Sequence, residues 1–435
     1  MSPLNSNNKV IHFTGICGTG MASLAVLLKL RGHQVRGSDE NVYPPMSDFL
    51  AQNKITVQSG FSAKNLDPEP DLVVIGNALS RGNPEVEAVL ESKLSYISMS
   101  ELLKEYFIRG KTSLVVSGTH GKTTTSSLLA WVFESAEKAP GFMIGGIAEN
   151  FKASCRDGDG SYFITEGDEY DTAFFDKRSK FFHYLPDQLI LNNLEFDHAD
   201  IFDSLADIKK AFRLMLRLIP RNGLIAANGD DANVQTVLES AYSPVVKFGF
   251  GKTSDVRALN LETSESGTAF EVEDKRRKES EQVKKFELKL SGAYNVRNAL
   301  GVIILARYNG ITDQTIQAAF NSFQSVRRRQ ELRGEVNGIA IYDDFAHHPT
   351  AVRETVTAIR QKHPGRRLIA VFEPRSNTSV LKIHQEVLID SFREADEVIL
   401  TTPHRLAQIP VEQRLEVPEV LKSLNDDKIP AYVFP

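Results

Sequence analysis

A glycine-rich turn between an apolar run and a helical pattern constrains the fold of this chain most strongly. The run at residues 113–117 leads into the turn at 118–124 (GTHGKTT), and helical periodicity continues through 128–133. In such a unit, backbone amides and the helix N-terminus point at phosphate oxygens. The turn is two residues shorter than the usual phosphate-binding loop, and a plain glycine-rich turn is the alternative. The flanking strand and helix favour phosphate binding, in which Lys122 bridges the β- and γ-phosphates and Thr123 binds Mg²⁺.

The same alternation of short apolar strands and helices recurs along the whole chain, which predicts an α/β fold with parallel sheets. A chain of 435 residues is too long for one ordinary domain. We expect a Rossmann-like domain at 1–110, a central P-loop domain with a parallel sheet at 111–326, and a Rossmann-like domain at 327–435. The predicted strands are 10–14, 34–38, 72–76, 113–117, 162–165, 188–191, 223–227, 338–342, 368–372 and 397–401, and the predicted helices are 21–30, 294–308, 312–323 and one from Thr350. Residues 255–290 are polar, alternating and rich in Lys and Glu, which predicts antiparallel hairpins at a sheet edge.

Charge and cysteine content exclude several classes of protein. The formal net charge of −5 offers no attraction to nucleic acid or to an anionic membrane surface. The two cysteines, Cys17 and Cys155, are too few for a disulfide scaffold and indicate a reducing compartment. The first ten residues lack the apolar core of a signal peptide, and no apolar run is long enough to span a bilayer. We therefore expect a cytoplasmic protein.

A second glycine-rich loop follows the first predicted strand. Gly15, Gly18 and Gly20 open a helix, as a dinucleotide-binding fingerprint does, although the spacing differs from the usual one. A tight strand-to-helix turn explains the same pattern equally well. Asp39 lies roughly 20 residues further on, where a ribose-binding acid is expected. Because no base is evident beside Cys17, we interpret that residue as a small turn residue and not as a nucleophile.

Two acidic clusters, 166–171 (EGDEYD) and 192–198 (NNLEFDH), each follow a predicted strand of the central segment. In a parallel sheet that edge is where ligands bind, and carboxylate oxygens suit Mg²⁺. Each cluster alone is also typical of a solvated loop, but their position downstream of the phosphate-binding turn favours metal binding. The segment 343–349 (DDFAHHP) contains adjacent histidines that point in different directions, so we expect substrate or nucleotide contact there and not a shared metal site.

Taken together and in this order, the motifs at 118–125, 166–171, 193–198, 294–298 (YNVRN) and 343–349 resemble those of the Mur ligases, over essentially the whole chain. Two branches of that family share the N-terminal loop and the His-His-Pro motif: one adds L-alanine to UDP-N-acetylmuramate and the other adds a recycled tripeptide. Residues 166–180, 193–200 and 373–378 resemble the tripeptide branch. Tyr170 stands where the alanine-adding branch usually has Ser.

This resemblance implies an ATP-dependent ligase that joins L-alanyl-γ-D-glutamyl-meso-diaminopimelate to UDP-N-acetylmuramate through an acyl phosphate, with Mg²⁺ as cofactor. The implied catalytic residues are Lys122, Glu166 and His198, and the implied metal ligands are Thr123, Glu166 and His198. The ATP site would comprise Gly118, Thr119, His120, Gly121, Lys122, Thr123, Thr124, Asn295, Asn298, Arg329 and Asp344. The UDP-sugar would contact Gly15, Gly18, Thr19, Gly20, Met21, Ser38 and Asp39, and the peptide would contact Arg375, Ser376, Asn377 and His347.

Three alternative functions remain at this point. The nearest is the alanine-adding ligase, which differs only in the amine it accepts. The others are a nucleotide-sugar oxidoreductase that uses the first loop for NAD, and a nucleotide-binding module without catalysis. Relatives usually continue past a strand like that at 431–435 into another helix, strand and turn. We therefore expect a truncated third domain with a short sheet.

Overall fold

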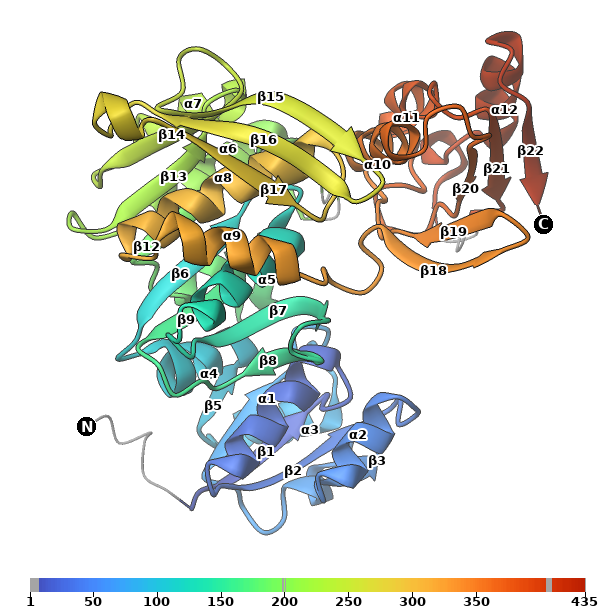
Figure 1. The fold of residues 1–435 in the computed structure, drawn as a ribbon. Helices are drawn as coiled ribbons and strands as arrows, with labels where there is room; N and C mark the ends of the chain where they lie inside the picture. The colour runs from blue at the N-terminus through green and yellow to red at the C-terminus, as the bar shows by residue number, and fades with distance from the viewer. Residues whose placement is uncertain (1–7, 198, 200, 404–408, 435) are drawn as a thin grey trace.

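The computed structural model describes residues 8–197, 199, 201–403 and 409–434, and it forms three α/β domains that follow one another along the chain (Figure 1). The N-terminal domain has one five-stranded parallel sheet in the order β3-β2-β1-β4-β5. Its elements are β1 (Val10–Thr14), α1 (Thr19–Leu30), β2 (Gln34–Asp39), α2 (Met46–Gln52), β3 (Thr56–Ser59), β4 (Leu72–Ile75), α3 (Pro84–Glu91), β5 (Tyr96–Ser98) and α4 (Met99–Leu103). The order reverses beside β1, so the loop after β1 opens at the crevice where such sheets bind ligands.

The central domain contains a ten-stranded sheet in the order β17-β16-β15-β14-β13-β12-β6-β9-β7-β8. Its strands are β6 (Thr112–Ser117), β7 (Gly141–Ala148), β8 (Ala153–Arg156), β9 (Tyr162–Gly167), β12 (Gln188–Leu191), β13 (Leu224–Asn228), β14 (Val245–Gly249), β15 (Val256–Ser264), β16 (Gly267–Asp274) and β17 (Val283–Leu288). A small hairpin, β10 (Asp171–Ala173) with β11 (Asp176–Ser179), stands apart. The helices are α5 (Lys122–Ser135), α6 (Leu205–Leu216), α7 (Ala232–Leu238), α8 (Ala293–Tyr308) and α9 (Asp313–Ser322).

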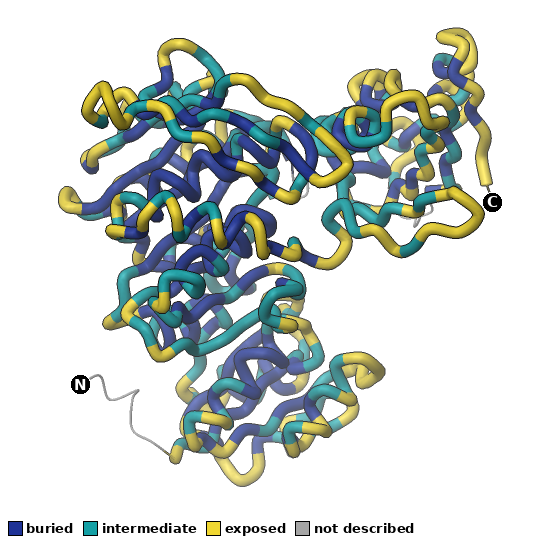
Figure 2. The backbone as a smooth tube through the Cα atoms, viewed as in Figure 1, coloured by how far each residue is buried: buried dark blue, intermediate teal, exposed yellow. Residues whose placement is uncertain are grey.

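The middle of this sheet is parallel and its two edges are antiparallel. Strand β6 lies between β9 and β12, parallel to both. Its residues Leu114, Val115 and Val116 are completely buried, because helices and neighbouring strands cover both faces of an apolar run (Figure 2). The predicted antiparallel hairpins at 255–290 are confirmed as β15, β16 and β17. The central sheet is thus mixed, with a parallel core that presents the carboxyl ends of β6, β9 and β12 at one edge.

The third domain contains a three-stranded parallel sheet and a separate two-stranded hairpin. Its elements are β18 (Glu331–Val336), β19 (Ile339–Asp343), α10 (Pro349–Lys362), β20 (Ile369–Phe372), α11 (Gln385–Ser391), β21 (Glu397–Thr401), α12 (Val417–Asp426) and β22 (Ala431–Phe434). The predicted strand at 338–342 is β19, but it pairs antiparallel with β18 and not with β20. The reason is the turn Asn337-Gly338, in which both residues have positive φ (51° and 77°), as a tight hairpin turn requires.

None of the helices in the described part of the chain is both long and apolar enough to cross a lipid bilayer.

Candidate active site

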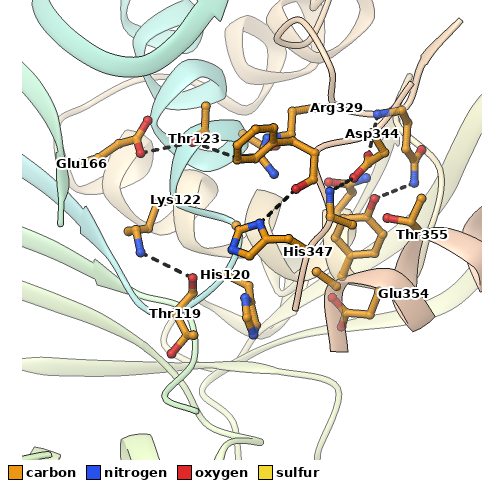
Figure 3. Close-up of a pocket in the computed structure, with 18 of the residues that line it drawn as sticks. Thr119, His120, Lys122, Thr123, Glu166, Arg329, Asp344, His347, Glu354 and Thr355 are labelled. Atoms are coloured by element: carbon orange, nitrogen blue, oxygen red, sulfur yellow. Dashed lines mark hydrogen bonds between the residues drawn. The ribbon is translucent and has the colours of Figure 1, made fainter. Parts of the chain in front are cut away.

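A cleft of about 230 Å³ lies where the strand ends of the central domain meet the start of the third domain. Lys122, Thr123 and Glu166 line its central-domain side, and Arg329 and Asp344 lie across from them (Figure 3). The other lining residues are Thr119, His120, Gly121, Thr124, Asp168, Tyr170, Asp197, Leu290, Tyr294, Asn295, Ser325, Gln330, Phe345, Ala346, His347, Ala351, Glu354 and Thr355. The phosphate-binding turn, the first acidic cluster and the 343–349 segment are therefore brought together in space.

The phosphate-binding turn adopts a backbone that only glycine accommodates easily. Gly118 and Gly121 have φ values of +132° and +82°, which side chains of L-residues rarely adopt. A β-carbon on Gly118 would lie 2.9 Å from the backbone N and O of Asn193, and one on Gly121 would lie 2.8 Å from Asn298 Oδ1. The turn therefore sits tightly on the loop after β12 and on α8, and α5 begins directly after it at Lys122.

Replacement of Gly121 by alanine should weaken both ATP binding and the fold. Left-handed backbone costs an alanine about 1–2 kcal/mol, and displacement of Asn298 adds to that loss. Gly365→Ala is the matched control, because Gly365 has a similar φ of +79° with no atom within 4 Å of the added carbon. Thermal unfolding and ATP titration compare the two variants. Equal losses of stability would show that the contact with Asn298 contributes nothing.

Lys122 is fixed from two sides. Its Nζ lies 2.8 Å from Glu169 Oε2 and donates a hydrogen bond to the carbonyl oxygen of Gly118 at 2.7 Å. Burial acts to lower the pKa of Lys122, but the carboxylates of Glu169 and Asp168 outweigh it and leave the pKa raised. Lys122 is therefore a permanent cation at the mouth of the loop. Sequence reasoning did not single out Glu169; its only signal was membership of the acidic cluster 166–171.

Glu166 presents a partly buried carboxylate at the end of β9. It accepts hydrogen bonds from the backbone N–H of Gly145 at 2.6 Å and from the Thr123 hydroxyl at 3.1 Å. Burial raises its pKa, against the lowering effects of the Gly145 N–H and of Lys122. With Asp168 also in the cleft, the oxygen donors fit a hard cation such as Mg²⁺. The third predicted ligand, His198, lies outside the described residues.

The third domain closes the cleft with a cation and an aromatic ring. Arg329 Nη2 lies 3.4 Å from the Thr123 hydroxyl, and its guanidinium carbon is 5.4 Å from the centroid of the Phe345 ring. Asp344 accepts hydrogen bonds from the backbone N–H groups of Gln330 at 2.7 Å and Ala346 at 2.8 Å. The Asp344 carboxylate therefore holds the segment that carries Arg329, and burial raises its pKa.

The two predicted adenine contacts on α8 take different positions. Asn295 is buried, lines the cleft and donates a hydrogen bond to the carbonyl oxygen of Ser291 at 2.8 Å. Asn298 lies beneath the turn, where its Oδ1 accepts a hydrogen bond from Asn192 Nδ2 at 3.3 Å. Of these two, only Asn295 faces the cleft, and Asn298 supports Gly121 from below.

The loop after β1 lies in the N-terminal domain, with Gly15, Gly18, Thr19 and Gly20 between β1 and the first turn of α1. The Asp39 carboxylate accepts a hydrogen bond from the backbone N–H of Cys17 at 2.9 Å, so it shapes this loop. Burial and Asp39 raise the pKa of the Cys17 thiol to about 11, which agrees with a turn residue and not with a nucleophile.

Two of the residues predicted to contact the UDP-sugar are buried beneath this loop. The Ser38 hydroxyl donates to Glu85 Oε2 at 2.6 Å inside the domain. Met21 packs in the core of the same domain. Both side chains support the loop from within.

The residues predicted to bind the peptide are not assembled in this structure. Arg375, Ser376 and Asn377 follow β20, and none of them lines the cleft. The Arg375 side chain is 70% exposed and lies 4.0 Å from Glu373. His347, in contrast, lines the cleft directly.

Comparison with known proteins covers nearly the whole chain. Residues 10–110 match the model "Mur ligase family, catalytic domain", residues 116–306 "Mur ligase middle domain", and residues 328–423 "Mur ligase, glutamate ligase domain". UDP-N-acetylmuramate–L-alanyl-γ-D-glutamyl-meso-2,6-diaminoheptandioate ligase of Escherichia coli is 46% identical over 90% of this chain and 85% of its own length. UDP-N-acetylmuramate–L-alanine ligase of Clostridium acetobutylicum is 34% identical over 91% and 83%.

A solved structure agrees with these relatives. A murein peptide ligase from Psychrobacter arcticus is 38% identical and superposes with a TM-score of 0.74, covering 98% of this chain and 91% of that one. The three matched domains, the two relatives and the solved structure from Psychrobacter arcticus all indicate one family. The chain belongs to the Mur ligase family of ATP-dependent, amide-bond-forming ligases.

Proposed function

We propose that this protein joins the tripeptide L-alanyl-γ-D-glutamyl-meso-diaminopimelate to UDP-N-acetylmuramate, with cleavage of ATP to ADP and phosphate, in the cytoplasmic recycling of peptidoglycan. The observation that carries the proposal is the 46% identity to the E. coli ligase named for these substrates, against 34% to the alanine-adding ligase of C. acetobutylicum. The cleft, in which Lys122 and Glu166 face Arg329, supports phosphoryl transfer at the seam of two domains.

The reaction needs two steps, because a carboxylate oxygen is a poor leaving group. The γ-phosphoryl group moves from ATP to the muramoyl carboxylate, which forms an acyl phosphate and ADP. The free amine of the tripeptide then attacks the acyl carbon through a tetrahedral intermediate, and phosphate leaves. Neither step requires covalent chemistry from the protein, so positioning and charge neutralisation dominate.

The residues of the cleft supply those two effects. The backbone amides of the 118–121 turn and the ammonium of Lys122 orient the β- and γ-phosphates. Arg329 and Phe345 approach from the third domain and help to exclude water from the acyl phosphate. Thr123, Glu166 and His198 would hold Mg²⁺, which when bound supplies further positive charge to the phosphate oxygens.

An acceptor screen tests the proposal. Phosphate release is measured with ATP, Mg²⁺ and UDP-N-acetylmuramate, in the presence of either the tripeptide or free L-alanine. We expect turnover with the tripeptide and little with L-alanine. The reverse preference would assign the protein to the alanine-adding branch. Absence of ATP turnover with every acceptor would favour a binding module, and hydride transfer to NAD would favour an oxidoreductase.

Arg375 is our candidate for recognition of the peptide. Guanidinium groups fork onto a carboxylate in two parallel hydrogen bonds, and such charge-assisted contacts contribute about 1.5–3 kcal/mol. Arg375→Ala should raise the apparent KM for the tripeptide about tenfold or more. Arg375→Lys should rescue this only partly, because an ammonium cannot form the fork.

The matched control is Arg393→Ala, which removes another exposed, ion-paired arginine of the third domain. Its KM should equal that of the unmodified protein. Arg375 is exposed and lies near Glu373 in this structure. For Arg375 to bind the peptide carboxylate, the third domain must therefore move toward the bound peptide. Equal KM values for Arg375→Ala and Arg393→Ala would remove Arg375 from the peptide site.

A further inference from the structure

Two histidines and a glutamate meet at the seam between the central and third domains, beside the nucleotide cleft. His120 belongs to the phosphate-binding turn, Glu195 to the loop after β12, and His348 is the N-cap residue of α10. His120 Nε2 lies 3.1 Å from Glu195 Oε2, and His348 Nδ1 lies 3.4 Å from the same oxygen. One ligand atom from each of the three side chains lies within 4.8 Å of the other two. Three potential metal ligands thus converge from two domains.

The hydrogen bonds of His348 define which of its nitrogens is available. Nε2 lies 3.3 Å from the carbonyl oxygen of Phe196, to which it can donate only as N–H. Nδ1 accepts a hydrogen bond from the backbone N–H of Thr350 at 3.3 Å. The proton therefore belongs on Nε2. The single lone pair of Nδ1 accepts the Thr350 N–H in this structure, so a cation bound at Nδ1 would replace that hydrogen bond.

The cluster combines a neutral imidazole with a charged carboxylate, whose Oε2 accepts a hydrogen bond from the Thr350 hydroxyl at 2.7 Å. Burial lowers the pKa of His348 to about 3, and the nearby His120 adds to the effect, so this imidazole is neutral. Burial acts to raise the pKa of Glu195, but hydrogen bonding to His120 and to Thr350 outweighs it and lowers that pKa to about 2. His348 Nδ1 and Glu195 Oε2 lie 3.4 Å apart, so a cation bound between them would have one neutral and one negative ligand.

The donor set selects the kind of ion. Two imidazole nitrogens and one carboxylate oxygen are the ligands of a typical zinc site with one open position. Tetrahedral coordination at about 2.0–2.1 Å places ligand atoms roughly 3.3 Å apart, close to the two separations described above. The Nε2–H of His348 on the Phe196 carbonyl is the second-layer hydrogen bond that metal-binding histidines usually make. With two imidazoles and one carboxylate, this cluster is richer in nitrogen ligands than the predicted Mg²⁺ site of Thr123, Glu166 and His198.

A further histidine borders the cluster. The ring centroid of His384 lies 4.9 Å from that of His348. Within the described residues, His384 Nε2 is buried without a hydrogen-bond partner. The third domain thus places a second imidazole beside His348.

We propose that His120, Glu195 and His348 form a binding site for a zinc-type divalent cation, which ties the third domain to the phosphate-binding turn. The ion joins a side chain of the nucleotide loop to the N-terminus of α10. Its binding therefore holds the two domains in the arrangement seen here. This goes beyond the proposed ligase reaction, whose Mg²⁺ is assigned to Thr123, Glu166 and His198.

Metal titration of the full-length protein without nucleotide tests the proposal, so that the readout is independent of catalysis. Zn²⁺ binding is measured by calorimetry, and Co²⁺ is used as a visible-absorbance probe of tetrahedral nitrogen and oxygen ligation. We expect one equivalent to bind at the seam. Glu195→Gln and His348→Asn should each weaken Zn²⁺ binding by about tenfold or more. Asparagine is chosen at position 348 because it preserves the N-cap of α10.

Two control variants separate this site from others. His363→Gln removes a histidine whose Nδ1 lies 3.7 Å from Glu265, a His–carboxylate pair without a second imidazole, and should leave Zn²⁺ affinity unchanged. Glu166→Gln should also leave it unchanged. Loss of Zn²⁺ binding in Glu166→Gln would place the ion in the Mg²⁺ site and overturn the proposal. Unchanged affinity in both Glu195→Gln and His348→Asn would overturn it as well, provided that thermal unfolding without metal shows both variants folded.

Discussion

Lys122→Ala should abolish phosphate release, with a loss on the order of 10³-fold or more in turnover. The charge that develops on the transferred phosphoryl group then lacks its fixed cation. The same change removes an ion-pair partner of Glu169, which is 3% exposed and 2.8 Å away. Removal of one member of a buried ion pair is costly, on the order of 3–5 kcal/mol, so Lys122→Ala should also lower stability.

A double variant separates these two effects. Lys122→Ala with Glu169→Gln should recover most of the lost stability, because a neutral amide then replaces the buried carboxylate that lost Lys122, but it should recover none of the activity. UDP-N-acetylmuramate binding should survive in both, since the predicted UDP-sugar site lies in the N-terminal domain. The control is Lys152→Ala, which removes an exposed lysine paired with Glu149 and should be neutral. Near-normal phosphate release from Lys122→Ala would exclude the turn from the mechanism.

Glu166→Gln should produce the second-largest loss, about 100-fold at low Mg²⁺, with partial recovery at high Mg²⁺. The amide keeps the size of the side chain but removes the charge that attracts the cation. Because the pKa of Glu166 is raised in the folded protein, the folded state holds this proton more tightly than the unfolded state does. Its contribution to stability therefore falls as pH rises from the unfolded pKa through the folded one.

The raised pKa of Glu166 gives a second test, the stability of the protein, which does not depend on catalysis. At neutral pH without Mg²⁺, Glu166→Gln should be at least as stable as the unmodified protein, because it removes a charge that desolvation disfavours. Added Mg²⁺ should raise the unfolding temperature of the unmodified protein and not that of the variant. Glu134→Gln, which alters an ion pair with Arg156 on the same domain, serves as control. The same Mg²⁺ response in Glu166→Gln and Glu134→Gln would show that the 166–171 cluster is a solvated loop and not a Mg²⁺ site.

Local patterns in the sequence were sufficient for most of the elements. The run at 113–117 became the buried strand β6, and the helix predicted from residue 294 became α8, because apolar periodicity reports directly on burial. The hairpin of β18 and β19 was missed although Asn337-Gly338 signals it. The apolar character of 338–342 predicts a strand, but the turn before it determines which strand it pairs with.

The candidate site was predictable only where its chemistry lies in contiguous motifs. Lys122, Glu166 and Arg329 share one cleft, as the motifs implied. Partnerships between distant residues were not predictable. Glu169 pairs with Lys122 across 47 positions, and Glu195 meets Thr350 across 155. Nothing local in the sequence encodes such pairs, because they depend on how two loops and two domains are placed in space.

The segment that connects the central and third domains also forms part of the wall of the nucleotide cleft. Val326 bridges to Ala148 of β7, while Ser325, Arg329 and Gln330 line the cleft itself. Any rotation of the third domain must therefore move residues of the cleft wall. By thermodynamic reciprocity, a ligand that binds the cleft more tightly at one interdomain angle must favour that angle by the same factor.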